Sequence, residues 1–274
     1  MDHGPLKLED YQESCTTSPG SCGVPKHIPQ SRVIEKMDEY MAKRDYEGAE
    51  RHLIYWLNEA RFLGDRRGEL TVRNELIGHY RKTANRENAL EQVDLALSLL
   101  KELDLDGTIS SGTVLVNAAT ALNAFGENER SLDLFQDALR VYEGNDSTDS
   151  SLLGGLYNNM GLTCCDLLRY DDAMVFFTLA VKKMSGVKAG ELERAITYLN
   201  MADCLLKQGG METNEPLIYS YLDKAEEDLL RDHDAEDGYI AFVFEKCAPV
   251  FSYYGYFKTA EDLKNKSEEL YARA

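Results

Sequence analysis

The sequence repeats itself about every 42 residues, and this period constrains the fold more than any other feature. A small residue, a bulky residue four positions later and another small residue seven positions later recur along the chain. The six copies begin at Ala49, Ala89, Ser131, Ala173, Ile218 and Ala260, at intervals of 40, 42, 42, 45 and 42 residues. Regular self-similarity of this kind is the signature of a repeat architecture.

The spacing within each copy describes one face of a helix. Positions i, i+4 and i+7 lie on one stripe, and small residues there let a neighbouring helix approach closely. Twelve residues before the anchor stands a second small residue, as in Ala119, Gly161 and Ala248, which we assign to a preceding helix. Each repeat is therefore predicted to be a helix pair. First helices are expected near 31–43, 67–83, 109–125, 150–168, 189–208 and 236–254, and second helices near 46–62, 86–103, 128–142, 170–184, 215–231 and 257–272.

The fourth copy resembles the tetratricopeptide repeat. Its matching residues are Tyr157, Met160, Gly161, Cys164, Tyr170, Ala173, Phe177 and Ala180. The period is longer than the 34 residues of the family, and the proline that usually ends the second helix is missing, as in the long repeats of kinesin light chains and bacterial peptide-sensing regulators. The resemblance covers roughly residues 31–272. It implies an all-α fold: a right-handed superhelical solenoid of six helix-turn-helix repeats over residues 31–274.

Residues 1–30 form a different segment, which holds four of the six prolines. Such composition favours a flexible leader when nothing else contacts it. We also consider the hypothesis that this leader lies along the solenoid, or in its groove as an internal ligand.

Charge narrows the set of partners. Thirty basic residues against 48 acidic ones give a net charge of −18, which would repel nucleic acid and anionic membrane surfaces. The distribution is uneven, with a basic stretch from Arg61 to Arg86 and an acidic one from Glu212 to Asp237. No apolar run reaches the ~20 residues of a membrane span, and none resembles a secretory signal. We therefore expect a cytoplasmic protein with protein or peptide partners.

Motifs for catalysis are missing from the sequence. It contains no phosphate-binding loop and no dinucleotide fingerprint, and its five histidines are scattered. Four cysteines sit inside helical patterns and are interpreted as small buried hydrophobes: Cys164, Cys165, Cys204 and Cys247. Cys15 and Cys22 are too widely spaced for a usual zinc pair. We expect no enzymatic activity, no metal and no cofactor.

A series of asparagines is the most informative polar pattern. Asn117, Asn159 and Asn200 each stand two residues before the small residue of a first helix, and Asn74 fits with one extra residue in its repeat. Lys246 takes the equivalent place in the last repeat. An asparagine side chain can pair with both the N–H and the C=O of a peptide. In tetratricopeptide proteins that this chain resembles, asparagines here hold peptide backbones in the concave groove; the alternative is a structural hydrogen bond between helices.

Neighbouring side chains would set specificity in such a groove. Arg73 and Lys246 could each accept a carboxylate, while Asn158 and Asp203 lie beside the series. The predicted ligand-binding residues are Arg73, Asn74, Asn117, Asn158, Asn159, Asn200, Asp203 and Lys246. The sequence thus favours an adaptor or regulatory scaffold that binds a protein or peptide. Two alternatives stay open: a self-assembling structural protein, or the sensor domain of a peptide-responsive regulator.

Overall fold

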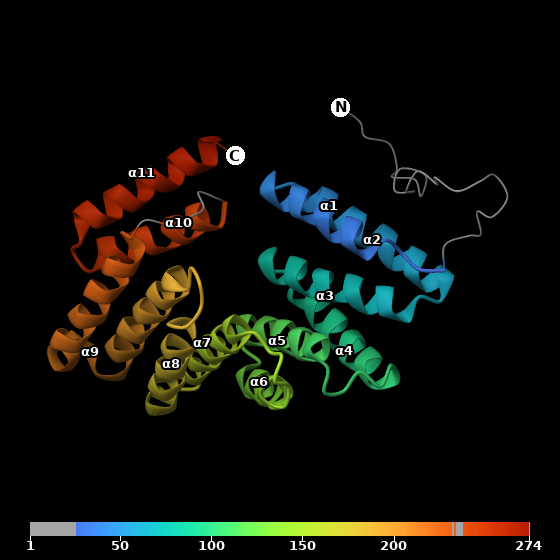
Figure 1. Cartoon of the computed structure of the whole chain (residues 1–274), viewed down its shortest axis with the longest axis horizontal. Coiled ribbons are helices and arrows are strands. Elements are labelled where there is room, and N and C mark those ends of the chain that lie inside the picture. Colours follow the sequence, from blue (N-terminus) through green and yellow to red (C-terminus); the bar gives the residue numbers. More distant parts are fainter. Residues whose placement is uncertain (1–25, 232, 234–237, 274) are drawn as a thin grey trace. The chain divides into compact units, whose positions relative to one another are not determined.

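The computed structural model describes residues 26–231, 233 and 238–273, and these residues form helices and turns without any strand. Eleven helices follow one another along the described chain, and most of them pack against a sequence neighbour (Figure 1). Their bounds are α1 Gln30–Ala42, α2 Tyr46–Leu63, α3 Arg66–Lys82, α4 Arg86–Glu102, α5 Ile109–Ala124, α6 Asn128–Glu143, α7 Ser150–Asp166, α8 Tyr170–Met184, α9 Glu191–Leu229, α10 Gly238–Tyr253 and α11 Phe257–Arg273. The predicted all-α architecture of helix pairs is confirmed.

Short polar residues determine where many of these helices begin. The side chain of Asp45 accepts a hydrogen bond from the N–H of Gly48 at 2.8 Å, and Asp65 caps α3 through Gly68 in the same way at 3.0 Å. Asn85, Thr108 and Asp149 cap α4, α5 and α7. These caps satisfy backbone donors that have no partner within the helix. Each cap follows the end of the preceding helix after only a few residues, so the connecting turns are short.

The fifth repeat has the two helices that the sequence predicted, but the insertion expected at 209–214 does not separate them. The two helices run together as α9 and are divided only by a kink at Gly210. Gly210 has φ 73° and ψ 177°, a conformation that a residue with a Cβ rarely adopts. Helical geometry resumes at once, so residues 211–214 belong to the second helix. The Asn214 side chain donates to the carbonyl of Leu205 at 2.8 Å, which ties the two halves together across the kink.

The repeat stripe forms the core. In the first five copies every member of the stripe is buried, with Ala49, Leu53 and Trp56 of the first copy at 0% exposure. Gly161 faces the ring of Phe177 so closely that a Cβ would lie 2.5 Å from it. The sixth copy is shifted: α11 buries Thr259, Leu263 and Ser267, whereas the Lys264 side chain is 71% exposed.

Contacts within the chain divide it into two compact units, the first ending at Val141 and the second beginning at Tyr142. The first unit holds α1 to α5 and most of α6, and the second holds α7 to α11. Each unit has its own apolar clusters: one around Trp56 and one around Leu122 in the first, and one around Phe251 in the second. Each unit therefore has the interior of an independently packed body.

The residues just before α1 are anchored on α3. The backbone N–H of Ile28 donates to Asp65 at 2.9 Å, and Nδ1 of His27 lies 3.2 Å from the other oxygen of that carboxylate. Burial pushes the pKa of Asp65 upward, but hydrogen bonds from Gly68 and Ile28 outweigh it, so the pKa lies below its usual value.

The hypothesis that the leader occupies a groove concerns mainly residues 1–25, which lie outside the described residues. Cys15 and Cys22 lie in the same segment. No described helix is long and apolar enough to cross a membrane.

Candidate peptide-binding surface

The asparagines of the first unit form a pair between two first helices. Nδ2 of Asn117 on α5 donates to the backbone carbonyl of Asn74 on α3 at 3.0 Å and to its side-chain oxygen at 3.2 Å. Both residues are half-buried. Asn74 fits the series only with one extra residue in its repeat. The structure nevertheless pairs it with Asn117, the next member of the series.

The second unit repeats this arrangement in a different register. Nδ2 of Asn200 on α9 donates to Oδ1 of Asn158 on α7 at 2.9 Å. The sequence pattern had placed Asn159 in the series and Asn158 beside it, but the residue that bonds to Asn200 is Asn158. The backbone carbonyl of Asn159 accepts a hydrogen bond from the hydroxyl of Thr163, and its side chain is half-buried. The spacing between small residues identified the right turn of α7 without resolving adjacent positions.

These bonds join first helices of consecutive repeats, so both asparagine pairs have a structural role. That role accords with the alternative of a hydrogen bond between helices. An asparagine side chain carries two N–H donors and an acceptor oxygen, however, and one bond does not exhaust the capacity of a pair. Half-buried side chains of this kind can hold neighbouring helices and still contact a ligand.

Arg73 does not belong to a binding surface, which corrects our expectation. The residue is 6% exposed. Its guanidinium donates to Glu69 at 3.1 and 2.7 Å and to the side-chain oxygen of Gln92 on α4 at 2.6 Å. Arg73 cannot accept a ligand's carboxylate, because its charge is already neutralised inside the first unit.

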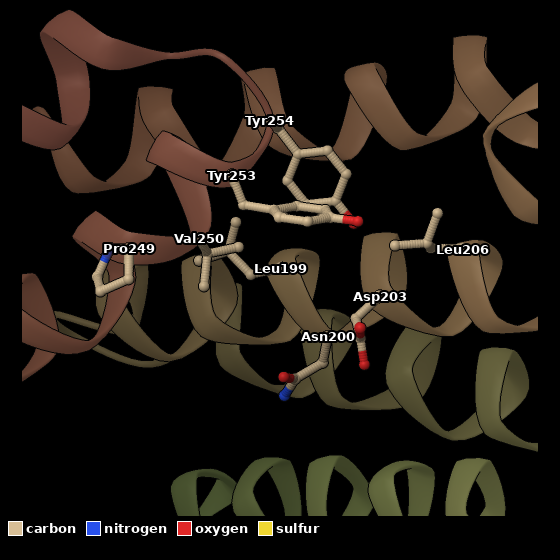
Figure 2. Close-up of a pocket in the computed structure, with 8 residues that line it drawn as sticks. All are labelled: Leu199, Asn200, Asp203, Leu206, Pro249, Val250, Tyr253 and Tyr254. Atoms are coloured by element: carbon tan, nitrogen blue, oxygen red, sulfur yellow. The ribbon is translucent and has the colours of Figure 1, made fainter.

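A cavity of about 530 Å³ opens between the first half of α9 and α10 in the second unit. Figure 2 shows two tyrosines, Tyr253 and Tyr254, on one side and two predicted binding residues, Asn200 and Asp203, on the other. The remaining lining residues are apolar: Leu199, Leu206, Pro249 and Val250. The cavity thus combines hydrogen-bonding groups with an apolar surface.

Helix α10 extends this surface with an exposed stripe. Phe242 is 43% exposed and Tyr253 is 73% exposed, and Lys246 is exposed between them at helical spacing. The ammonium of Lys246 lies 5.7 Å from the centre of the Phe242 ring, within the range of a cation–π contact. Lys246 therefore lies on the same helix face as Tyr253, although it does not line the cavity.

Comparison with known proteins identifies the fold. No family model and no curated protein matches the sequence. TPR-like repeats attributed to a kinesin light chain of Podosopora anserina match with a TM-score of 0.50 at 12% identity, covering 74% of this chain and 95% of that one, and a variant of the same repeats matches at 0.52. MamA matches at 0.48 and 16% identity, over 73% of this chain and 91% of that one. BtubC from P. vanneervenii matches at 0.48 and 17% identity, over 90% and 92%.

The chain has a tetratricopeptide-like repeat fold. At 12% identity the likeness concerns the arrangement of helices and not the ligand. The predicted resemblance is confirmed at this level. The ligand of these repeats therefore depends on the side chains that this chain presents.

The charge in the cavity of this TPR-like chain comes from Asp203. Its carboxylate lies 2.8 Å from the ammonium of Lys207 one turn along α9, with the two side chains 50% and 49% exposed. Burial, followed by the charge of Asp203, raises the pKa of Tyr254 to about 12. The hydroxyl of Tyr254 consequently stays protonated at neutral pH and remains available as a donor.

The cysteines carry no evident chemistry. Cys164, Cys165, Cys204 and Cys247 are all buried, which confirms their interpretation as small core residues. A hydrogen bond between the thiols of Cys165 and Cys204, reinforced by burial, raises the pKa of Cys165 far above its usual range. The described residues hold no group of three or more side chains able to bind a metal.

Proposed function

We propose that the chain is a binding protein, an adaptor or regulatory scaffold, that holds an extended peptide segment of a partner on the first-helix face of its second unit. The observation that carries this proposal is the cavity between α9 and α10. There Asn200 and Asp203 meet two tyrosines and an apolar surface in one place.

The chemistry of the cavity suits a peptide. An extended backbone presents N–H and C=O groups that must stay paired when they leave water. The amide groups of Asn158 and Asn200 lie next to each other, so they can pair with a ligand backbone as well as with one another. The apolar residues and tyrosines of the cavity would contact the side chains of the peptide. The volume of the cavity lies within the range of ordinary ligand pockets.

The exposed stripe of α10 supports the same surface. Large aromatic residues are enriched where proteins bind partners, because they bury much area with little loss of conformational freedom. Phe242 and Tyr253 are spaced about three turns apart on the helix that forms one wall of the cavity. A peptide that fills the cavity could contact both rings along α10, with Lys246 between them for an acidic group.

Selection of peptides tests this proposal. The full chain would be immobilised and challenged with a displayed library of random dodecamers, and the binders measured by calorimetry. We expect one peptide per chain, with affinity lost in Tyr253→Ala and kept in Phe257→Ala. These aromatic residues are 73% and 71% exposed in the same unit, but only Tyr253 lines the cavity. Equal losses in both variants, or the absence of any binder, would contradict the proposal.

Self-assembly is a second candidate function. Among the described residues, nine exposed large hydrophobic side chains lie in the second unit and three in the first. Exposed apolar groups mark surfaces that bind other proteins, including further copies of the same chain. Sedimentation velocity across a hundredfold range of concentration would test this. A mass that rises with concentration would favour assembly, and a constant monomer would exclude it.

A further inference from the structure

The cavity of the second unit has a defined electrostatic character. Of its eight described lining residues, only Asp203 carries a formal charge. The carboxylate is half-exposed, so a ligand can reach it. On the other side of the cavity stand Tyr253 and Tyr254, whose rings meet edge to face with centroids 4.9 Å apart. The cavity therefore offers negative charge and electron-rich rings above an apolar surface.

These features together match a long cationic side chain. Lysine and arginine carry their charge at the end of an aliphatic stem, which packs on apolar groups while the head reaches a polar one. Leu206 and Val250 supply the apolar surface for a stem. Asp203 can accept a charge-assisted hydrogen bond from the head, and the tyrosine faces attract a cation. An anionic side chain would meet like charge in the same place.

We infer that this cavity selects a lysine or arginine side chain of the bound peptide. The inference rests on the proposed function and adds the residue class that the second unit recognises. The charge of the whole chain acts in the same direction, because a net −18 draws cationic segments toward the surface and repels acidic ones.

Lys207 is the internal competitor for Asp203. The two side chains are one helical turn apart and about half-exposed, and such pairs are weak because water screens them. The hydrogen bond to Asp203, with the fields of Asp203 and Asp166, raises the pKa of Lys207, so this ammonium stays charged. A ligand cation must therefore displace Lys207 or share the carboxylate with it. Removing the Lys207 charge should strengthen binding.

The experiment uses peptides selected on the full chain as described above. We expect lysine or arginine at one position in most binders. Replacing that residue by norleucine, which keeps the stem and removes the charge, should weaken binding about tenfold, as should Asp203→Asn. Combining both changes should cost no more than either alone, because they remove the same interaction. Lys207→Gln should strengthen binding of the original peptide by a few-fold.

The outcomes separate the two proposals. Binders without a basic residue, or a norleucine effect that persists fully in Asp203→Asn, would overturn the inference and leave peptide binding intact. No binder at the cavity would overturn the proposed function and the inference together. Circular dichroism melting checks that Asp203→Asn folds like the parent. The norleucine peptide tests the inference without altering the protein at all.

Discussion

The two units of this chain share one helix-pair plan but differ in where they place polar and apolar side chains. Within residues 26–141, the described part of the first unit, five acidic, basic or histidine residues are buried: His52, Asp65, Glu69, Arg73 and His79. Among the described residues of the second unit, one of this kind is buried, Asp228, which is held by two bonds from Arg194 at 3.0 and 2.6 Å. Exposed large hydrophobic residues show the reverse distribution, with three in the first unit and nine in the second.

These opposite distributions indicate different roles for the two units. A buried charge is tolerated only when its partners are in place, so the polar interior of the first unit admits few alternative packings. Exposed aromatic and aliphatic side chains contribute little to a folded monomer and are typical of contact surfaces. We therefore interpret the first unit as the more rigidly specified body and the second as the one that meets a partner.

The largest expected effect tests the polar interior of the first unit. Arg73→Met would leave Glu69 buried with one partner fewer and remove the bond to Gln92. Breaking a buried pair from one side should lower the free energy of unfolding by about 3–5 kcal/mol. Arg130→Met removes an exposed pair with Asp94 in the same unit and should cost about 1 kcal/mol or less. Urea denaturation of both variants measures the difference, and equal losses would contradict the rigid interior.

A glycine pair in α7 tests the packing of the second unit. Gly161→Ala places a Cβ 2.5 Å from the Phe177 ring and should destabilise the unit by about 1–3 kcal/mol. Gly155→Ala in the same helix meets nothing within 4 Å and should stabilise by about 0.5–1 kcal/mol. The melting temperatures of the two variants should therefore shift in opposite directions from that of the parent chain. A shared direction would show that the register of the second unit is wrong.

Acidification should loosen the first unit more than the second. Burial lowers the pKa of both His52 and His79 from the ordinary value of 6.5. Between the lowered folded value and 6.5 the unfolded state binds more protons, so stability falls as the pH falls through that window and is constant above it. Hydrogen exchange from about pH 8 to about pH 5, corrected for intrinsic rates, should show α2 and α3 losing protection first. Equal loss in α9 and α10 would remove this distinction between the units.

The smallest effects concern the asparagine pairs. Asn117→Ala in the first unit and Asn200→Ala in the second each remove the bonding between first helices at that pair. Each should cost about 0.5–1.5 kcal/mol of stability, the net value of a neutral hydrogen bond. Only Asn200→Ala should also weaken peptide binding, because Asn200 lines the cavity. Calorimetry with one selected peptide decides this, and a similar loss of affinity in Asn117→Ala would extend the binding surface to the first unit.

The repeat period determined most of the architecture from the sequence alone. Small residues such as Ala173 and Gly161 must recur where helices touch, because backbones can approach only over small side chains. Many helix starts are also set locally, because carboxylates such as those of Asp45 and Asp65 cap the helix that follows them. These signals lie within a few residues of one another, so they can be interpreted without knowing the tertiary contacts.

The tertiary structure alone decided which of the predicted binding residues are accessible at the surface. Arg73 and Lys246 were both predicted to bind a carboxylate. In the structure Arg73 is hydrogen-bonded to Glu69 and Gln92, whereas Lys246 is exposed. Asn158 and Asn159 differ by one position, which turns a helical side chain through about 100°. Pro249 and Tyr253 line one cavity with Asp203 only because of how α10 packs against α9. That contact joins residues far apart along the chain, and local sequence patterns do not specify it.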